Sequence, residues 1–198
     1  MKLTNFFLLV LALTFMPGIG AVRADSPSPL ANEVILIVRH AEKVPDGPGL
    51  TPQGQQRANL YVNYFKTFKV DGAVRPPDSL FASADSKKTQ RCRLTITPLS
   101  KALGLPINAA IKNKDVDDLA KLIQTNPGGK TVLIAWHHEQ IANILLDLGV
   151  NPLDLIPNNT WPEDRYNWLI ELRYDGNGRL EPSQDKLLVE HILPTDTK

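Results

Sequence analysis

Two short, unbroken apolar runs constrain the fold more than any other feature of this sequence. Residues 34–38 read Val-Ile-Leu-Ile-Val, and residues 131–136 read Thr-Val-Leu-Ile-Ala-Trp. Runs of this length, rich in β-branched side chains and without polar alternation, are typical of strands buried on both faces. Such strands occur in parallel sheets that are covered by helices on both sides. The two runs therefore predict an α/β protein with a mostly parallel central sheet.

The rest of the chain alternates between predicted helices and predicted strands. A first helix should begin at Thr51-Pro52, because a capping threonine followed by proline is a common helix start. The alternation predicts one domain with helices on both faces of the sheet. Further helices are expected at about Gln90–Leu103, at Asp115–Gln124 and, after the strand 131–136 and His137-His138-Glu139, as far as Leu148-Gly149. Further strands are expected at Leu80–Ala82, Trp168–Tyr174 and, as an edge strand, Leu187–Leu193.

The N-terminus has the features of a secretory signal peptide. Lys2 precedes an apolar stretch at residues 6–16, and Val22 and Ala24 occupy the −3 and −1 positions of a cleavage site. This stretch is shorter than the ~20 residues that a membrane-spanning helix needs. We therefore predict a signal peptide at 1–24, a flexible Pro/Ser-rich tether at 25–32 and one domain at 33–198. The expected location is secreted or periplasmic, with no stable membrane association after cleavage.

Charge and cysteine content exclude several classes of function. The chain has 22 basic and 21 acidic residues, and loss of Lys2 and Arg23 with the signal would leave 20 and 21. A nearly neutral protein has no global electrostatic attraction for nucleic acid or an anionic membrane. Cys92 is the only cysteine, so no intramolecular disulfide and no multi-thiolate zinc site is expected.

Histidines follow both of the clearest predicted strands. Arg39-His40 ends the first apolar run, and His137-His138 follows the second. Ligands of an open α/β sheet bind beyond the carboxyl ends of its strands, so these side chains are expected to converge there. Histidine can act as a nucleophile or base, and arginine donates bidentate hydrogen bonds to phosphate oxygens. The pattern therefore indicates phosphoryl chemistry.

Four segments resemble, in order, the motifs of the histidine phosphatase superfamily, the phosphoglycerate mutase-like proteins. The first departs from the usual Arg-His-Gly only in having alanine at position 41. The resemblance covers about Glu33 to Gly149. The four segments are Arg39-His40-Ala41-Glu42-Lys43, Leu50-Thr51-Pro52-Gln53-Gly54-Gln55-Gln56-Arg57-Ala58, Phe81-Ala82-Ser83 with Arg91 and Thr95, and the strand-to-helix run 132–141.

The resemblance implies a phosphatase that hydrolyses a phosphomonoester or a phosphoprotein without a metal or other cofactor. His40 would attack the phosphorus and form a phosphohistidine, while Arg39 and Arg91 would bind the phosphate oxygens. The second catalytic histidine is His137 if the strand aligns with the common Ser-His or Gly-His members. It is His138 if Trp136 aligns with members that have Trp-Glu-His. Both alternatives stay open at this stage.

The proton donor for the leaving group is less well defined by sequence. Glu42 and Glu139 are candidates because they adjoin the motifs, and Asp164 lies in a late loop near the expected site. The absence of a clear donor, together with Ala41, supports an alternative hypothesis. In that alternative the chain is a non-catalytic domain that binds phosphate or phosphoproteins and retains the fold. Residues 137–139 do not match the His-Glu-x-x-His pattern of a metal site.

Overall fold

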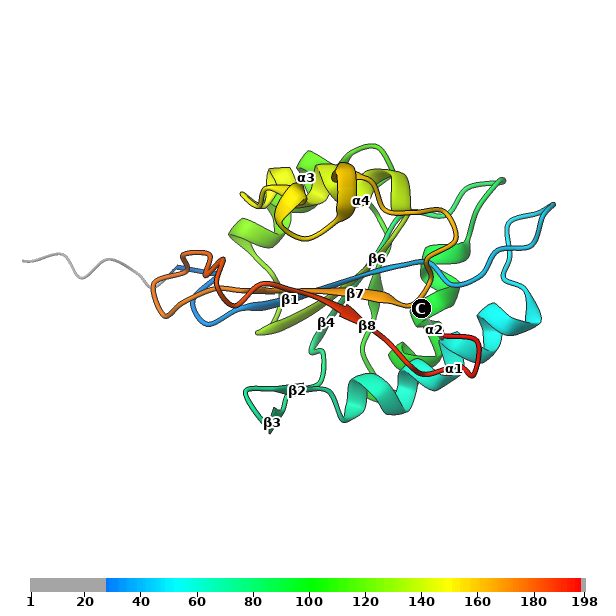
Figure 1. Ribbon diagram of the computed structural model, residues 1–198, viewed down its shortest axis with the longest axis horizontal. Helices are drawn as coiled ribbons and strands as arrows, with labels where there is room; N and C mark the ends of the chain where they lie inside the picture. The colour runs from blue at the N-terminus through cyan, green and yellow to red at the C-terminus, as the bar shows by residue number, and fades with distance from the viewer. Residues whose placement is uncertain (1–27, 197–198) are drawn as a thin grey trace, which may run out of the picture.

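The computed structural model describes residues 28–196, which form a six-stranded mixed sheet between two layers of helices (Figure 1). The strand order is β5-β4-β6-β1-β7-β8. β1 and β6, which carry the two apolar runs, lie side by side in the middle of this order. The strands are β1 (Val34–Arg39), β4 (Ser79–Ala82), β5 (Ile107–Asn108), β6 (Thr131–Trp136), β7 (Trp168–Arg173) and β8 (Lys186–Val189).

Pairing within the sheet confirms the predicted class. β5, β4, β6 and β1 run parallel to one another, whereas β7 is antiparallel to β1 and β8 is antiparallel to β7. β1 pairs with β6 along its whole length, from Val34 opposite Thr131 to Arg39 opposite Trp136. This register brings the carboxyl ends of the two strands to the same edge of the sheet.

Helices cover both faces of the sheet, as predicted. α1 (Pro52–Lys66) and α2 (Arg91–Leu103) lie on one face, whereas α3 (Val116–Thr125) and α4 (His138–Asp147) lie on the other (Figure 1). Successive β1 side chains contribute to different cores, because side chains alternate between the faces of a strand. Leu36 packs in the core with α1 and α2, and Ile37 packs in the core with α3 and α4.

Several short elements were not predicted. β2 (Lys69–Val70) and β3 (Ala73–Val74) form a small hairpin, β5 has two residues, and two short 3-10 helices, η1 (Pro152–Asp154) and η2 (Pro157–Asn159), follow α4. Such elements are too short to produce a periodic pattern. The last strand ends at Val189 rather than at the expected Leu193. The chain beyond it leaves the sheet edge and folds back towards α1 (Figure 1).

The N-terminal predictions fall mostly outside the described residues. The predicted signal peptide at 1–24 lies wholly outside them. Of the predicted tether, residues 28–32 form a turn in which Leu30 is buried, and the Asn32 backbone N–H donates to the Asp175 carbonyl (2.8 Å). Within residues 28–196, no helix combines the length and the apolar character needed to cross a membrane.

Candidate active site

Arg39, His40 and His137 meet where β1 and β6 end. The His40 backbone N–H donates to the Trp136 carbonyl (2.9 Å), which continues the strand pairing by one residue. The imidazole rings of His40 and His137 lie with centroids 5.2 Å apart at an interplanar angle of 72°. All three side chains are buried. The convergence expected from strand topology is therefore present for these residues.

His40 is held as a neutral imidazole with a defined orientation. Its Nδ1 lies 2.7 Å from the Ala41 carbonyl oxygen, and a carbonyl can only accept, so Nδ1 carries the proton. Nε2 therefore has the free lone pair. Burial lowers the pKa of His40 to about 2, and the positive charges of Arg39 and Arg91 contribute to this decrease. The imidazole ring thus stays neutral at neutral pH, and its Nε2 is available as a nucleophile.

Arg39 is anchored on one side and unpaired on the other. Its Nη1 donates to the backbone carbonyls of Pro162 (3.1 Å), Glu163 (2.6 Å) and Arg165 (3.2 Å). Its guanidinium carbon lies 4.0 Å from the centroid of the Tyr166 ring, a cation–π contact. Nε and Nη2 are buried and have no hydrogen-bond partner within residues 28–196. These two groups form the edge of the guanidinium that can bind an anion bidentately.

Arg91 begins α2 and supplies a second cationic group. Its Nε is buried without a partner among the described residues, and Nη2 makes only long contacts of 3.4 and 3.5 Å with the carbonyls of Gly47 and Lys88. Its charge contributes to the lowered pKa of both His40 and His137. Arg91, which the motif alignment selected, is therefore a cation whose electric field acts on the imidazole rings of both His40 and His137.

The geometry separates the two adjacent histidines. His137, the N-cap residue of α4, is buried beside His40, and its Nε2 lacks a hydrogen-bond partner in the described chain. His138 faces elsewhere: its Nδ1 lies 3.3 Å from Glu139 and its Nε2 lies 3.8 Å from Glu163. Successive side chains at a strand end point in different directions. The arrangement therefore favours His137 as the histidine that joins His40.

The loop after His40 is fixed by backbone contacts from two helices. The Ala41 N–H donates to Thr95 Oγ1 (2.8 Å), and the Thr51 N–H donates to the Glu42 carbonyl (2.9 Å). Thr51 also caps α1 by accepting from the Gly54 N–H (3.0 Å). A Cβ on Gly54 would collide with the Glu42 carbonyl oxygen. The threonines and the glycine of the second and third motifs therefore hold the backbone next to the nucleophile.

The candidate proton donors are engaged in other interactions. Glu42 accepts from Arg57 Nε (3.1 Å) and Nη2 (2.7 Å). Glu139 accepts from the Asn113 amide (3.0 Å). Burial alone would raise the pKa of Glu139, but hydrogen bonds from its own backbone and from Asn113 hold that pKa below its usual value. The Asp164 side chain is 77% exposed and lies 3.9 Å from Arg165. Glu139 is thus held as an ion, and the Glu42 carboxylate is occupied by Arg57.

Arg57 forms a buried cluster that the sequence prediction missed. Its guanidinium is only 2% exposed and binds Asp196 through Nη1 (3.0 Å) and Nη2 (2.7 Å), in addition to Glu42. Asp196 also accepts from the Leu193 N–H (2.9 Å). This cluster connects the C-terminal segment, α1 and the loop after His40. Arg57 lay within the second motif, but no sequence pattern marked Asp196 as its partner.

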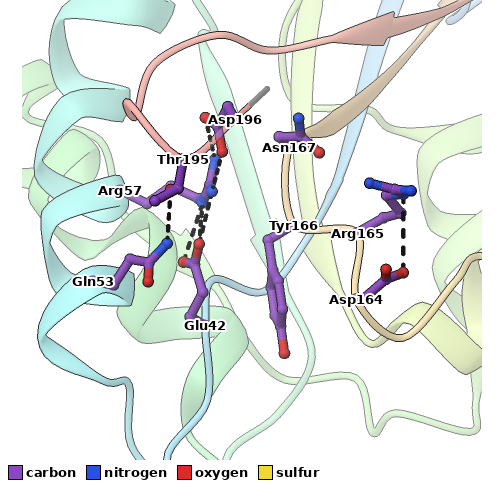
Figure 2. A pocket seen from close by; sticks show the side chains of 9 residues that line it. All are labelled: Glu42, Gln53, Arg57, Asp164, Arg165, Tyr166, Asn167, Thr195 and Asp196. Atoms are coloured by element: carbon purple, nitrogen blue, oxygen red, sulfur yellow. Dashed lines mark hydrogen bonds and ion pairs between the residues drawn. The ribbon is translucent and has the colours of Figure 1, made fainter. Parts of the chain in front are cut away.

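A polar cavity of about 320 Å³ lies beside these residues (Figure 2). Its wall includes Tyr166, the residue that contacts Arg39, and Glu42, which lies two positions after His40. The side chains in Figure 2 come from the loop after β1, from α1, from the loop before β7 and from the C-terminal segment. The nine lining residues are Glu42, Gln53, Arg57, Asp164, Arg165, Tyr166, Asn167, Thr195 and Asp196.

Comparisons with known proteins give matches in structure but not in sequence. The sequence matches no protein-family model and no curated protein. The fold is similar to the protein histidine phosphatase SixA, solved with tungstate (20% identity, TM-score 0.51, covering 75% of this chain and 92% of that chain). It is also similar to a phosphoglycerate mutase from Plasmodium falciparum (20% identity, TM-score 0.51, covering 85% and 98%).

These two structures match nearly their whole length to this chain, so the likeness covers a complete domain. It agrees with the mixed sheet, whose central parallel strands are covered by helices on both faces. It also agrees with the motif resemblance, whose four segments lie between Arg39 and Ile141. The chain therefore has a phosphoglycerate mutase-like fold.

Proposed function

We propose that this protein is a phosphatase that hydrolyses a phosphorylated substrate through a phosphohistidine intermediate on His40. One observation carries the proposal: a neutral imidazole lies among cationic groups that have unpaired N–H donors. The unpaired donors are Nε and Nη2 of Arg39 and Nε of Arg91. An arrangement of this kind suits a phosphoryl group, whose equatorial oxygens carry the charge of the transition state.

In the proposed first step, His40 Nε2 attacks the phosphorus in line with the leaving oxygen. The new P–N bond forms as the P–O bond breaks, and the leaving oxygen takes a proton from His137. Burial lowers the pKa of His137. A bound phosphate dianion would favour the protonated imidazole, since an opposite charge nearby raises a histidine pKa. Arg39 and Arg91 stabilise the equatorial oxygens.

In the second step, water attacks the phosphohistidine and His137 takes a proton from that water. The P–N bond breaks, inorganic phosphate leaves and His40 returns to its neutral form. No metal is needed to balance either step. The role of His137 as acid and base is proposed because the carboxylates of Glu42 and Glu139 are held in other interactions.

A generic aryl phosphate, p-nitrophenyl phosphate, tests this proposal. We expect turnover that survives a chelator, is inhibited by vanadate and vanishes in His40→Ala. His137→Asn and His138→Asn form a matched pair: the first should reduce kcat by roughly 10²–10⁴-fold, the usual contribution of acid–base catalysis, and the second by much less. A requirement for a divalent metal, or an equal loss in both variants, would contradict the mechanism.

A non-catalytic domain that binds phosphate or phosphoproteins is the second candidate. It is favoured by the engagement of two of the three candidate donors, because Glu42 is bound to Arg57 and Glu139 to Asn113. Calorimetric titration with phosphate distinguishes the two candidates. Binding that depends on Arg39, with no turnover of any phosphoester, would support the second candidate and refute the first.

Export from the cytoplasm is part of the proposal. It rests on the signal-peptide pattern of residues 1–24. Expression of the full chain in a bacterium, followed by fractionation and intact-mass measurement, tests it. Cleavage after Ala24 should give a secreted or periplasmic protein that begins at Asp25, whereas an uncleaved cytoplasmic chain would contradict the prediction.

A further inference from the structure

The polar cavity begins one side chain away from the proposed nucleophile. Tyr166 forms part of its wall, and the Tyr166 ring lies 6.2 Å from the His40 ring and 4.0 Å from the guanidinium carbon of Arg39. Glu42, on the loop that follows His40, forms another part (Figure 2). A group attached to a phosphate held by Arg39 would therefore have this cavity next to it.

Carboxylates outnumber cations in the wall of the cavity. Arg57 binds both Glu42 and Asp196 at 2.7 Å. The other cation of the wall, Arg165, lies 3.9 Å from Asp164. The cavity wall thus holds three carboxylates and two guanidinium groups. A second anionic group on the substrate would therefore meet a net negative charge here.

The wall is also predominantly polar. All nine lining side chains carry a polar or charged group, and Tyr166 is the only aromatic one. Gln53 and Thr195 are joined by a hydrogen bond of 2.9 Å and lie on the same wall (Figure 2). Ligand pockets usually have predominantly apolar linings and volumes of ~300–1,000 Å³. A volume of about 320 Å³ with a polar lining suits one small group rich in hydroxyls.

Resting on the proposed phosphatase function, we infer that this cavity binds the leaving group and that the substrate is a phosphomonoester of a neutral, hydroxyl-rich alcohol such as a sugar or polyol. Carboxylate and amide oxygens of the wall accept hydrogen bonds from the hydroxyls, and the amide and guanidinium groups donate to them. An alcohol that carries a carboxylate is disfavoured by the net negative charge. An aromatic or aliphatic alcohol would displace water from the polar wall without replacing the hydrogen bonds of that water.

The test compares phosphate release from two esters by the same protein. Glucose 6-phosphate has a neutral, hydroxylated leaving group, and 3-phosphoglycerate has a carboxylated one. We expect kcat/KM for glucose 6-phosphate to exceed that for 3-phosphoglycerate by at least about tenfold, since like-charge repulsion and unpaired polar groups both act against the second ester.

A charge exchange at Asp164 then tests whether the cavity is responsible. Asp164→Lys should shift the ratio of the two kcat/KM values towards 3-phosphoglycerate by at least about fivefold, because the cavity gains a cation in place of an anion. Asp147→Lys makes the same charge change at an exposed position at the far end of α4 and should leave the ratio unchanged.

The outcomes separate the two levels of the proposal. A wild-type preference for 3-phosphoglycerate, or equal shifts in Asp164→Lys and Asp147→Lys, would overturn the leaving-group site and leave the phosphatase intact. Release of phosphate from neither sugar, aryl nor carboxylated esters would overturn the proposed phosphatase function and the leaving-group site with it. A shift confined to Asp164→Lys would establish the site.

Discussion

Replacement of Glu190 by glutamine should stabilise the protein at alkaline pH and have little effect at pH 5. Glu190 is 1% exposed, and its Oε2 accepts a hydrogen bond from the Tyr61 hydroxyl (2.8 Å). Its Oε1 is buried with no partner among residues 28–196. Burial raises the pKa of Glu190 from 4.5 to about 8, although Tyr61 and Arg57 both lower it. Glutamine has nearly the same shape as the protonated acid and cannot ionise.

The size of the effect follows from proton linkage. A carboxyl whose pKa is raised by folding stabilises the protein below its unfolded-state pKa, and this stabilisation is lost as pH rises through the folded-state pKa. For Glu190 this loss of stability extends from about pH 4.5 to about pH 8, the two pKa values. Each pH unit within that window lowers the free energy of unfolding by about 1.4 kcal/mol. Between pH 5 and pH 9 the wild type should lose about 4 kcal/mol through Glu190, and Glu190→Gln should lose none of it.

Urea unfolding of the wild type and Glu190→Gln at pH 5, 7 and 9 measures the difference directly. The free energy of unfolding of the variant, minus that of the wild type, should rise by about 4 kcal/mol from pH 5 to pH 9. Asp46→Asn, at an exposed loop position, is the matched control and should show no such rise. A difference that stays constant with pH would refute the reasoning that Glu190 folds as a protonated acid.

Three further predictions concern the groups around the site. Arg57→Met should reduce the free energy of unfolding by about 3–5 kcal/mol in urea titrations. The reason is that Glu42 and Asp196 would be left as mostly buried carboxylates without their ion-pair partner. A loss below about 1 kcal/mol would contradict this. Gly54→Ala should lower the free energy of unfolding by about 1–3 kcal/mol in the same assay and should also lower kcat/KM. The new Cβ would collide with the Glu42 carbonyl oxygen next to the nucleophile. Wild-type values for both quantities would argue against that contact. Cys92 is 1% exposed, and burial raises the pKa of its thiol to about 12. Iodoacetamide at pH 8 should therefore label Cys92 only after unfolding, which mass spectrometry can follow. Rapid labelling of the folded protein would refute the burial of this thiol.

Much of the fold could be predicted because its central elements have strong local patterns. The predicted run 131–136 coincides with β6, and the predicted run 34–38 is extended by only Arg39 in β1. α2 and α3 each begin one residue after the expected position. β5 and the β2–β3 hairpin were missed because two-residue strands form through pairing with neighbours. The last strand was predicted too long because its apolar residues continue beyond Val189.

The candidate site, like the fold, could be predicted from the sequence only in part. The sequence by itself determined which residue types stand at the strand ends: Arg39 and His40 after one buried run, and two histidines after the other. These positions follow from local hydrophobicity and from the rule that parallel strands present their carboxyl ends at one edge. The motif spacing also selected Arg91 among the basic residues of its segment.

Only the tertiary structure decided between alternatives that are equivalent along the chain. His137 and His138 are neighbours in sequence, but strand geometry turns one towards His40 and the other towards Glu139. The pairing of Arg57 with Asp196 joins residues 139 positions apart, so no local pattern encodes it. Side-chain direction and long-range ion pairing depend on how the elements pack around the sheet. The pairing of Glu42 with Arg57, and with it the proposal of His137 as the proton donor, is therefore a consequence of packing.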